Sequence, residues 1–284
     1  MKKNNFFKYI FLAPVIIYSI TLILLPLIYI FFLSFCKNDF YGGIIYTPTI
    51  SNYIEIFNIT YLKILLKSSL IALIATFICI CISYPFALIL RERSEKTRNL
   101  MTKLVMVPFL TNSLIRTYGW IVLLRKNGVI NTGLLGTGLI KAPLNLMYNN
   151  LGIVIGMSYT LLPFMILPVC SSVFKIDNSL IEAAKDLGAK PISIFMSIII
   201  PETISGVFNG SLMVFIPAIG YFFIADILGG GKVMIIGNLI KNQFLTARNW
   251  PFGSSISIFL ILITFLLVRI YQKLGGKLDD LGGM

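Results

Sequence analysis

The sequence predicts an all-α membrane protein with six transmembrane helices. Of its 284 residues, 57% are hydrophobic and only 12% are charged, and the mean hydropathy is +0.89. A water-soluble globular protein carries about 25% charged residues, so this composition excludes an ordinary soluble enzyme. Long charge-free stretches alternate with short charged segments, and about 20 apolar residues suffice to cross roughly 30 Å of hydrocarbon as a helix.

Six segments are predicted to span the membrane, within a single transmembrane domain over residues 1–284. Four are free of charge throughout, namely 9–36, 68–90, 203–225 and 249–268, and a fifth covers 151–174. The sixth, 104–124, contains Arg116. Because a charge deep in a span is costly, either Arg116 has a functional role or this span is irregular. In the second case only five spans remain.

The first segment is expected to be an uncleaved helix. Its 28 charge-free residues exceed the 7–15-residue apolar core of a signal peptide, and no A-x-A cleavage site follows.

Metal and disulfide chemistry is not expected. The chain has no histidine, and its four cysteines are never at C-x-x-C spacing. In apolar surroundings they are interpreted as small buried hydrophobic residues. We therefore expect no cofactor bound by this chain.

The net charge of +13 bears on two questions, namely whether the chain binds nucleic acid and how it is oriented in the membrane. Nucleic-acid-binding proteins gather basic residues on one wetted face, whereas here they fall between apolar stretches, so no nucleic-acid partner is expected. With the N-terminus inside, the interior segments carry 14 basic residues in 65 positions and the exterior segments 9 in 78. This bias predicts cytoplasmic N- and C-termini for a multi-pass protein embedded in membrane lipid.

The segment 175–201 is predicted to be a cytoplasmic loop that contains a short helix over 180–187. Ser179 and Glu182 have the spacing of a capping box, in which each side chain accepts from the backbone N–H of the other residue. Gly188 stands where a left-handed C-terminal cap belongs. Lys190 and Pro191 then restart a helix that leads to Pro201 and the next span.

One face of this short helix is apolar. Leu180, Ala183, Ala184 and Leu187 recur at the spacing of a helix face, and Lys185 and Asp186 lie off it. Such a face either packs under the protein's own membrane helices or binds a soluble partner. The pattern alone favours neither interpretation.

Residues 182–189, Glu-Ala-Ala-Lys-Asp-Leu-Gly-Ala, resemble the E-A-A-x-x-x-G loop of ABC importer permeases. The resemblance implies a type I ABC importer permease fold in a bacterial cytoplasmic (inner) membrane, with this helix as a coupling helix that fits a cleft on an ATPase. The implied coupling residues are Ser179, Glu182, Ala183, Ala184, Asp186, Gly188 and Pro201. The implied partners are ABC ATPase subunits that hold ATP and Mg, a second permease subunit and an extracytoplasmic solute-binding protein.

A narrower group is indicated by three other segments. Residues 108–120, with Arg116, Tyr118 and Trp120, resemble a stretch of the spermidine/putrescine permeases, as do 227–232 and 249–253. The resemblance implies a small cationic solute.

The chain itself is not expected to be an enzyme. A phosphate-binding loop needs G-x-x-x-x-G-K-[ST]. At Gly231-Lys232 the first glycine of this motif is replaced by Asp226 and the final Ser or Thr by Val233. At Gly276-Lys277 the same two positions also lack the required residues.

A polyamine pathway would need carboxylates or aromatic faces, because desolvating ammonium groups without partners is costly. Asp226 is the carboxylate bordering a span on the predicted outer side. Aromatic rings at comparable depth are those of Tyr118, Trp120, Tyr159, Tyr221 and Phe222. The alternative is that Asp226 pairs with Arg116, which neutralises two costly charges.

Two alternatives in function stay open. One is an ABC permease for another small solute, such as iron, thiamine or a sulfate-type anion. The other is a secondary transporter that needs no ATPase, although the paired half-repeats typical of that class are not visible.

Overall fold

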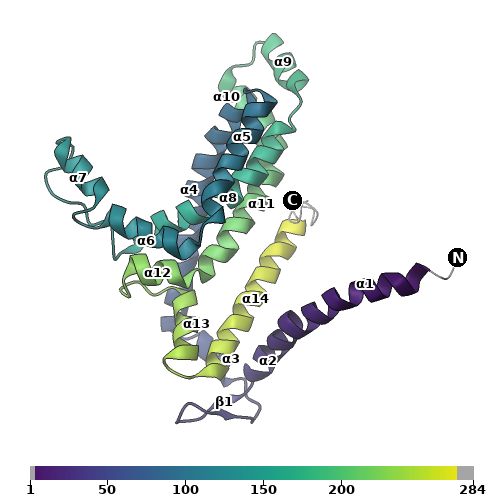
Figure 1. The fold of residues 1–284 in the computed structure, drawn as a ribbon, viewed down its shortest axis with the longest axis vertical. Helices are drawn as coiled ribbons and strands as arrows, with labels where there is room; N and C mark the ends of the chain where they lie inside the picture. The colour runs from purple at the N-terminus through teal and green to yellow at the C-terminus, as the bar shows by residue number, and fades with distance from the viewer. Residues whose placement is uncertain (1–3, 274–284) are drawn as a thin grey trace. The chain divides into compact units, whose positions relative to one another are not determined.

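The computed structural model describes residues 4–273, which are helical almost throughout (Figure 1). The chain divides into two compact units. One holds residues 4–62 and 239–265, and the other holds residues 63–238 and 266–273.

The first unit begins with a long apolar helix. It consists of α1 (Asn4–Ser19), the π-turn η1 (Ile20–Leu24) and α2 (Leu25–Leu33). A small antiparallel hairpin follows, made of β1 (Lys37–Asn38) and β2 (Ile44–Ile45), and then α3 (Ser51–Ile56). Asn52 of α3 contacts the C-terminal end of α2, since its Nδ2 donates to the carbonyl oxygens of Ser34 at 3.0 Å and Cys36 at 2.8 Å.

The second unit contains most of the helices. Its elements are most of α4 (Ile59–Arg91), α5 (Glu95–Met106), the 3₁₀ turn η2 (Val107–Leu110), α6 (Ser113–Leu124), α7 (Val129–Gly136), α8 (Asn150–Phe174), α9 (Asn178–Asp186), α10 (Pro191–Ile194), the π-turn η3 (Phe195–Ile199), α11 (Ile200–Gly220) and α12 (Phe222–Gly229). The last two helices, α13 (Ile236–Leu245) and α14 (Trp250–Lys273), are shared between the units.

Helix α8 forms the core of the second unit, and small residues let α11 and α12 approach it closely. A Cβ on Gly206 of α11 would lie 2.0 Å from the Oγ of Ser172 and 2.7 Å from the carbonyl oxygen of Pro168. A Cβ on Gly156 of α8 would lie 2.4 Å from a methyl group of Leu228 in α12. Close backbone approach at small residues is how membrane helices pack without a hydrophobic driving force.

Five described helices are long and apolar enough to cross a membrane: Leu12–Leu33, Ile59–Arg91, Asn150–Phe174, Pro191–Gly220 and Trp250–Lys273. They contain the predicted spans 68–90 and 151–174, and they overlap 9–36, 203–225 and 249–268. An all-α membrane protein is therefore confirmed, whereas six uninterrupted spans are not.

The predicted span 104–124 is interrupted. Helix α5 ends at Met106, the 3₁₀ turn η2 contains Pro108, and α6 starts after Asn112. Pro108 has no N–H for the helical hydrogen-bond ladder, and the Asn112 side chain accepts from the N–H of Leu114 at 2.8 Å, which begins a new helix. The irregular alternative for this segment is correct.

The predicted span 203–225 has different bounds. Its helix begins at Pro191, passes through the π-turn η3 just before Pro201, and ends at Gly220. At Tyr221 the backbone leaves the helix, with φ −77° and ψ 62°, and α12 starts as a separate helix. Hydropathy missed this break because both sides of it are apolar.

Candidate functional site

The first candidate site is α9 with its flanking turns, which the sequence predicted as a coupling helix. The helix exists, but it starts earlier than expected. Asp177 is the N-cap residue, and its Oδ1 accepts from the backbone N–H of Ser179 at 3.0 Å. The Ser179–Glu182 capping box is therefore wrong, because an Asp two residues upstream already supplies the oxygen that the first turn needs.

The C-terminal end of α9 is closed as predicted. Gly188 has a left-handed conformation, with φ +76°. The N–H of Gly188 donates to the carbonyl of Lys185 at 2.9 Å, and the N–H of Ala189 donates to that of Ala184 at 3.0 Å. These two bonds form a Schellman motif, which satisfies carbonyls that a helix end would otherwise leave open.

Arg91, the last residue of α4, fixes the start of α9. Its Nη2 donates to the carbonyl oxygen of Ile176 at 3.0 Å and to the Oδ1 of Asn178 at 2.7 Å. Sequence analysis missed Arg91, Asp177 and Asn178 as site residues. A signal for Asp177 was present, since Asp-Asn-Ser before an apolar helical run is typical of a helix start.

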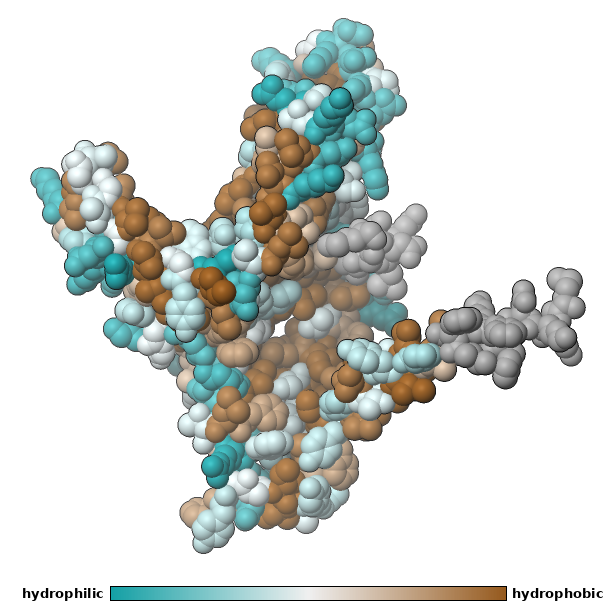
Figure 2. Space-filling view, in the orientation of Figure 1, coloured by the Kyte–Doolittle hydropathy of each residue, from teal (hydrophilic) through white to brown (hydrophobic). Residues whose placement is uncertain are grey.

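The apolar face of α9 is not covered by the other described residues of the chain. Within this helix, all of whose residues are described, none is buried. Leu187 is 88% exposed and Leu180 is 45% exposed. Figure 2 shows hydrophilic residues gathered at the end of the second unit that carries α9, and hydrophobic residues along the long helices below it. The alternative that α9 packs under its own membrane helices is therefore not what the structure shows.

Of the other coupling residues, Ser179, Glu182, Ala183 and Asp186 are exposed and Ala184 is partly exposed. Pro201, the last residue of the predicted loop 175–201, lies well inside a helix that starts at Pro191, as the restart predicted at Lys190 and Pro191 implies. It occupies the first turn of α11, inside the continuous Pro191–Gly220 helix, about three helical turns beyond the start of that helix at Pro191.

The second candidate site is the set of aromatic and charged residues predicted along a solute pathway. The structure brings two of them together across α6 and α8, since the rings of Trp120 and Tyr159 meet edge to face with centroids 5.3 Å apart. Tyr118 lies on the same helix as Trp120 but is 58% exposed. Tyr221 and Phe222 both contact Phe223, with centroids 4.8 Å and 6.2 Å apart.

Arg116 lies over an aromatic ring. Its guanidinium carbon is 5.7 Å from the ring centroid of Phe109, which in turn meets the ring of Phe164 edge to face at 5.0 Å. Its buried Nε has no hydrogen-bond partner within the part of the chain that the structure describes. Ring faces attract cations by their quadrupole, so Phe109 offsets part of the cost of this partly buried charge.

Asp226 has a different neighbour. The Nδ2 of Asn238 donates to its Oδ1 and also to the carbonyl oxygen of Phe222 at 3.1 Å. Asn238 therefore ties the carboxylate to the first turn of α12, and the sequence analysis missed it. The pairing of Asp226 with Arg116, which the sequence offered as an alternative, stays a prediction.

Among the described residues, no three His, Cys, Asp or Glu side chains gather as they would around a metal ion.

Comparisons with known proteins match this architecture. A family described as "Binding-protein-dependent transport system inner membrane component" matches residues 83–279. The spermidine/putrescine transport system permease protein PotB of Haemophilus influenzae is 42% identical over 270 residues, covering 95% of this chain and 94% of that protein. PotB of Escherichia coli K12 is 40% identical over 262 residues, covering 92% and 95%.

Solved structures agree at the level of the fold. A chain of a bacterial alginate ABC transporter, crystallised in complex with an alginate pentasaccharide-bound periplasmic protein, superposes with a TM-score of 0.74 at 15% identity, covering 94% of this chain and 93% of that one. A chain of the MetNI methionine ABC transporter gives 0.54 at 15% identity, covering 75% and 93%. The protein is thus a multi-pass membrane transport component, and it belongs to the family of binding-protein-dependent transport system inner membrane components.

Proposed function

We propose that this chain is one transmembrane subunit of an ATP-driven importer for spermidine and putrescine. It forms part of the translocation pathway and is coupled through α9 to a separate ATPase, which holds ATP and Mg. The N- and C-termini lie in the cytoplasm in this proposal, as the distribution of basic residues favours.

The observation that carries the coupling role is the exposed, doubly capped α9. Asp177 caps its N-terminus and Gly188 its C-terminus, and these caps stabilise the helix although none of its residues is buried. An apolar residue as exposed as Leu187 is typical of a surface that a partner covers.

The observation that favours polyamines is the identity of 40% or more to proteins named as spermidine/putrescine permeases, over nearly their whole length. Asp226 and the rings of Trp120 and Tyr159 supply the carboxylate and aromatic faces that a cationic solute needs. Tyr118, Tyr221 and Phe222 stay predicted pathway residues on the same reasoning.

In the proposed cycle, two permease subunits receive the solute from an extracytoplasmic binding protein. Closure of the ATPase subunits moves the α9 helices of the permeases and tips the helices between outward and inward openings. The helix that follows α9 runs unbroken from Pro191 to Gly220, so a displacement of α9 is transmitted into a membrane span.

Gly188 gives the sharpest test of the coupling role. A Cβ there meets no atom within 4 Å, so only the left-handed backbone conformation restricts the residue. Gly188→Val should abolish spermidine uptake and ATPase co-purification while the chain still inserts. Gly188→Asn should keep most of both, because Asn tolerates this conformation. Equal uptake in the two variants would contradict the proposal.

Cross-linking identifies the partner directly. We expect a cysteine at the exposed Ala183 to capture an ATP-hydrolysing protein in cells that import spermidine, and one at Lys185, off the apolar face, to capture less. If Ala183→Cys captures no such protein during active uptake, the coupling role is wrong. Spermidine binding to the solute-binding partner, with no binding of thiamine or sulfate, would separate polyamines from the other solutes.

A further inference from the structure

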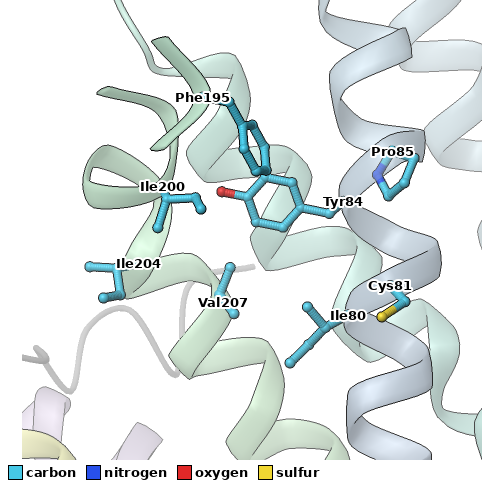
Figure 3. Close-up of a pocket in the computed structure, with 8 residues that line it drawn as sticks. All are labelled: Ile80, Cys81, Tyr84, Pro85, Phe195, Ile200, Ile204 and Val207. Atoms are coloured by element: carbon cyan, nitrogen blue, oxygen red, sulfur yellow. The ribbon is translucent and has the colours of Figure 1, made fainter. Parts of the chain in front are cut away.

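A cavity of about 440 Å³ opens between α4 and the helix formed by α10, η3 and α11 (Figure 3). One wall comes from α4 through Ile80, Tyr84 and Pro85, and the other through Phe195, Ile204 and Val207. The hydroxyl of Tyr84 is already engaged by Thr203. Since the lining side chains are otherwise apolar, the cavity suits an apolar occupant.

The π-turn η3 shapes one end of this cavity. It carries Phe195, whose ring meets that of Tyr84 edge to face with centroids 5.6 Å apart. Single π-turns inside helices are frequent at functional sites. Glu202 lies on this helix too, but its helical spacing places it off the face that carries Ile204 and Val207.

A basic residue follows each wall of the cavity at a distance shorter than one leaflet of a bilayer. Pro85 lies six residues before Arg91, which is about 9 Å along a helix, and Phe195 lies five residues after Lys190, which is about 7.5 Å. One leaflet contributes about 15 Å of hydrocarbon. Both basic residues therefore lie within the depth of one leaflet from the nearer end of the cavity.

Positive charge is concentrated around these basic residues. Residues 91–98 hold four basic and two acidic side chains. The side chains of Arg93 and Lys190 are both exposed, and within residues 4–273 neither side chain has a hydrogen-bond partner. Basic pockets next to grooves between membrane helices bind the headgroups of anionic lipids.

We propose that this cavity holds an acyl chain of an anionic phospholipid, whose headgroup binds Arg93 and Lys190. The apolar walls, together with basic side chains less than one leaflet's depth away, point to this one occupant. The lipid would lie against η3, between the cytoplasmic α9 and the span that follows it.

The test uses the assembled, full-length transporter in lipid nanodiscs that contain phosphatidylglycerol with a diazirine near the end of one acyl chain. Phosphatidylcholine with the same chain is the charge control. After illumination, mass spectrometry locates the labelled residues. We expect phosphatidylglycerol to label the stretches 80–85 and 195–207 several times more than phosphatidylcholine does.

Two pairs of variants make the test specific. Arg93→Gln with Lys190→Gln should remove the excess, whereas Lys63→Gln with Lys67→Gln, at the other end of α4, should not. Val207→Trp should fill the cavity and lower the labelling, whereas Ile89→Trp, on α4 outside the cavity, should not.

Equal labelling by the two lipids would overturn the proposal. So would labelling that is lost in the assembled transporter but present in the isolated chain, because another subunit would then cover the cavity. None of these readouts depends on which solute is transported, so they are separate from the test of the proposed function.

Discussion

Arg91 at the end of α4 and Asn178 at the start of α9 are joined by a hydrogen bond of 2.7 Å, from the guanidinium Nη2 to the amide oxygen. The same nitrogen donates to the carbonyl of Ile176. Through these bonds the candidate coupling helix is attached to a membrane span other than the two that flank it in sequence. Arg91 thus links α9 directly to α4, in addition to the chain connection from α9 to α10 and α11.

The first prediction concerns this attachment. Arg91→Lys replaces a planar fork of donors by a single ammonium, which cannot reproduce the bonds to both Ile176 and Asn178. Because the pair is partly exposed, we expect a coupling free energy with Asn178→Ala of about 0.5–1 kcal/mol. A double-mutant cycle on thermal unfolding in detergent measures it. Additive effects of the two substitutions would show that the bond contributes nothing.

The second prediction concerns the pH dependence of α9. The backbone N–H of Ser179 donates to the Asp177 carboxylate and holds the pKa of Asp177 below its usual value. A lowered native pKa means that the cap stabilises the helix above the ordinary Asp pKa of about 3.9 and is lost as pH falls through the lower native value. Amides at 179–182 should therefore lose protection from hydrogen exchange only in strong acid.

Asp177→Asn is the matched control, because its amide oxygen still caps the helix but does not titrate. Protection at 179–182 should then be independent of pH after correction for intrinsic exchange rates. Asp177→Ala should lower the protection at every pH. An acid transition that persists in Asp177→Asn would assign the effect to another group.

The third prediction concerns the contact between α8 and α11. Gly206→Ala would place a methyl group against Ser172 and the backbone of Pro168, so the helices must separate or strain. Overpacking of this kind costs about 1–3 kcal/mol. We expect a clear decrease in the thermal unfolding temperature of the purified protein. Gly220→Ala, where a Cβ meets nothing within 4 Å, should leave it nearly unchanged.

The fourth prediction separates a solute-binding role of Asp226 from a structural one. Asp226→Asn keeps an oxygen that accepts from Asn238 but removes the negative charge. If the carboxylate binds a cationic solute, the KM for spermidine uptake should rise about tenfold, equivalent to about 1.4 kcal/mol, with a normal amount of assembled chain.

Arg116→Gln is the comparison variant for Asp226. Removal of the Arg116 guanidinium should alter the amount of folded chain more than the KM, because this partly buried group contacts the ring of Phe109. If both variants lose assembly to the same degree and neither changes KM, Asp226 has no role in the pathway.

Hydropathy predicted the long spans well because a helix in lipid must satisfy its own backbone, so apolar length decides its existence. It failed where helices break inside apolar sequence. Pro108 and Asn112 interrupt one predicted span, and Tyr221 ends another, through local backbone geometry that composition does not register.

The candidate site shows the same division. Gly188 was predictable, since a left-handed cap needs glycine at a fixed place. The contacts of Arg91 with Asn178 and of Asn238 with Asp226 were not, because each depends on segments that only the folded chain brings together.

The closed ends of α9 have a thermodynamic consequence for assembly. A recognition helix that folded only on contact would lose backbone entropy at that moment and weaken the complex accordingly. Here Asp177 and Gly188 impose that ordering before any encounter. If α9 is the coupling helix, its partner binds a helix that is already ordered, and less of the contact energy is lost on binding.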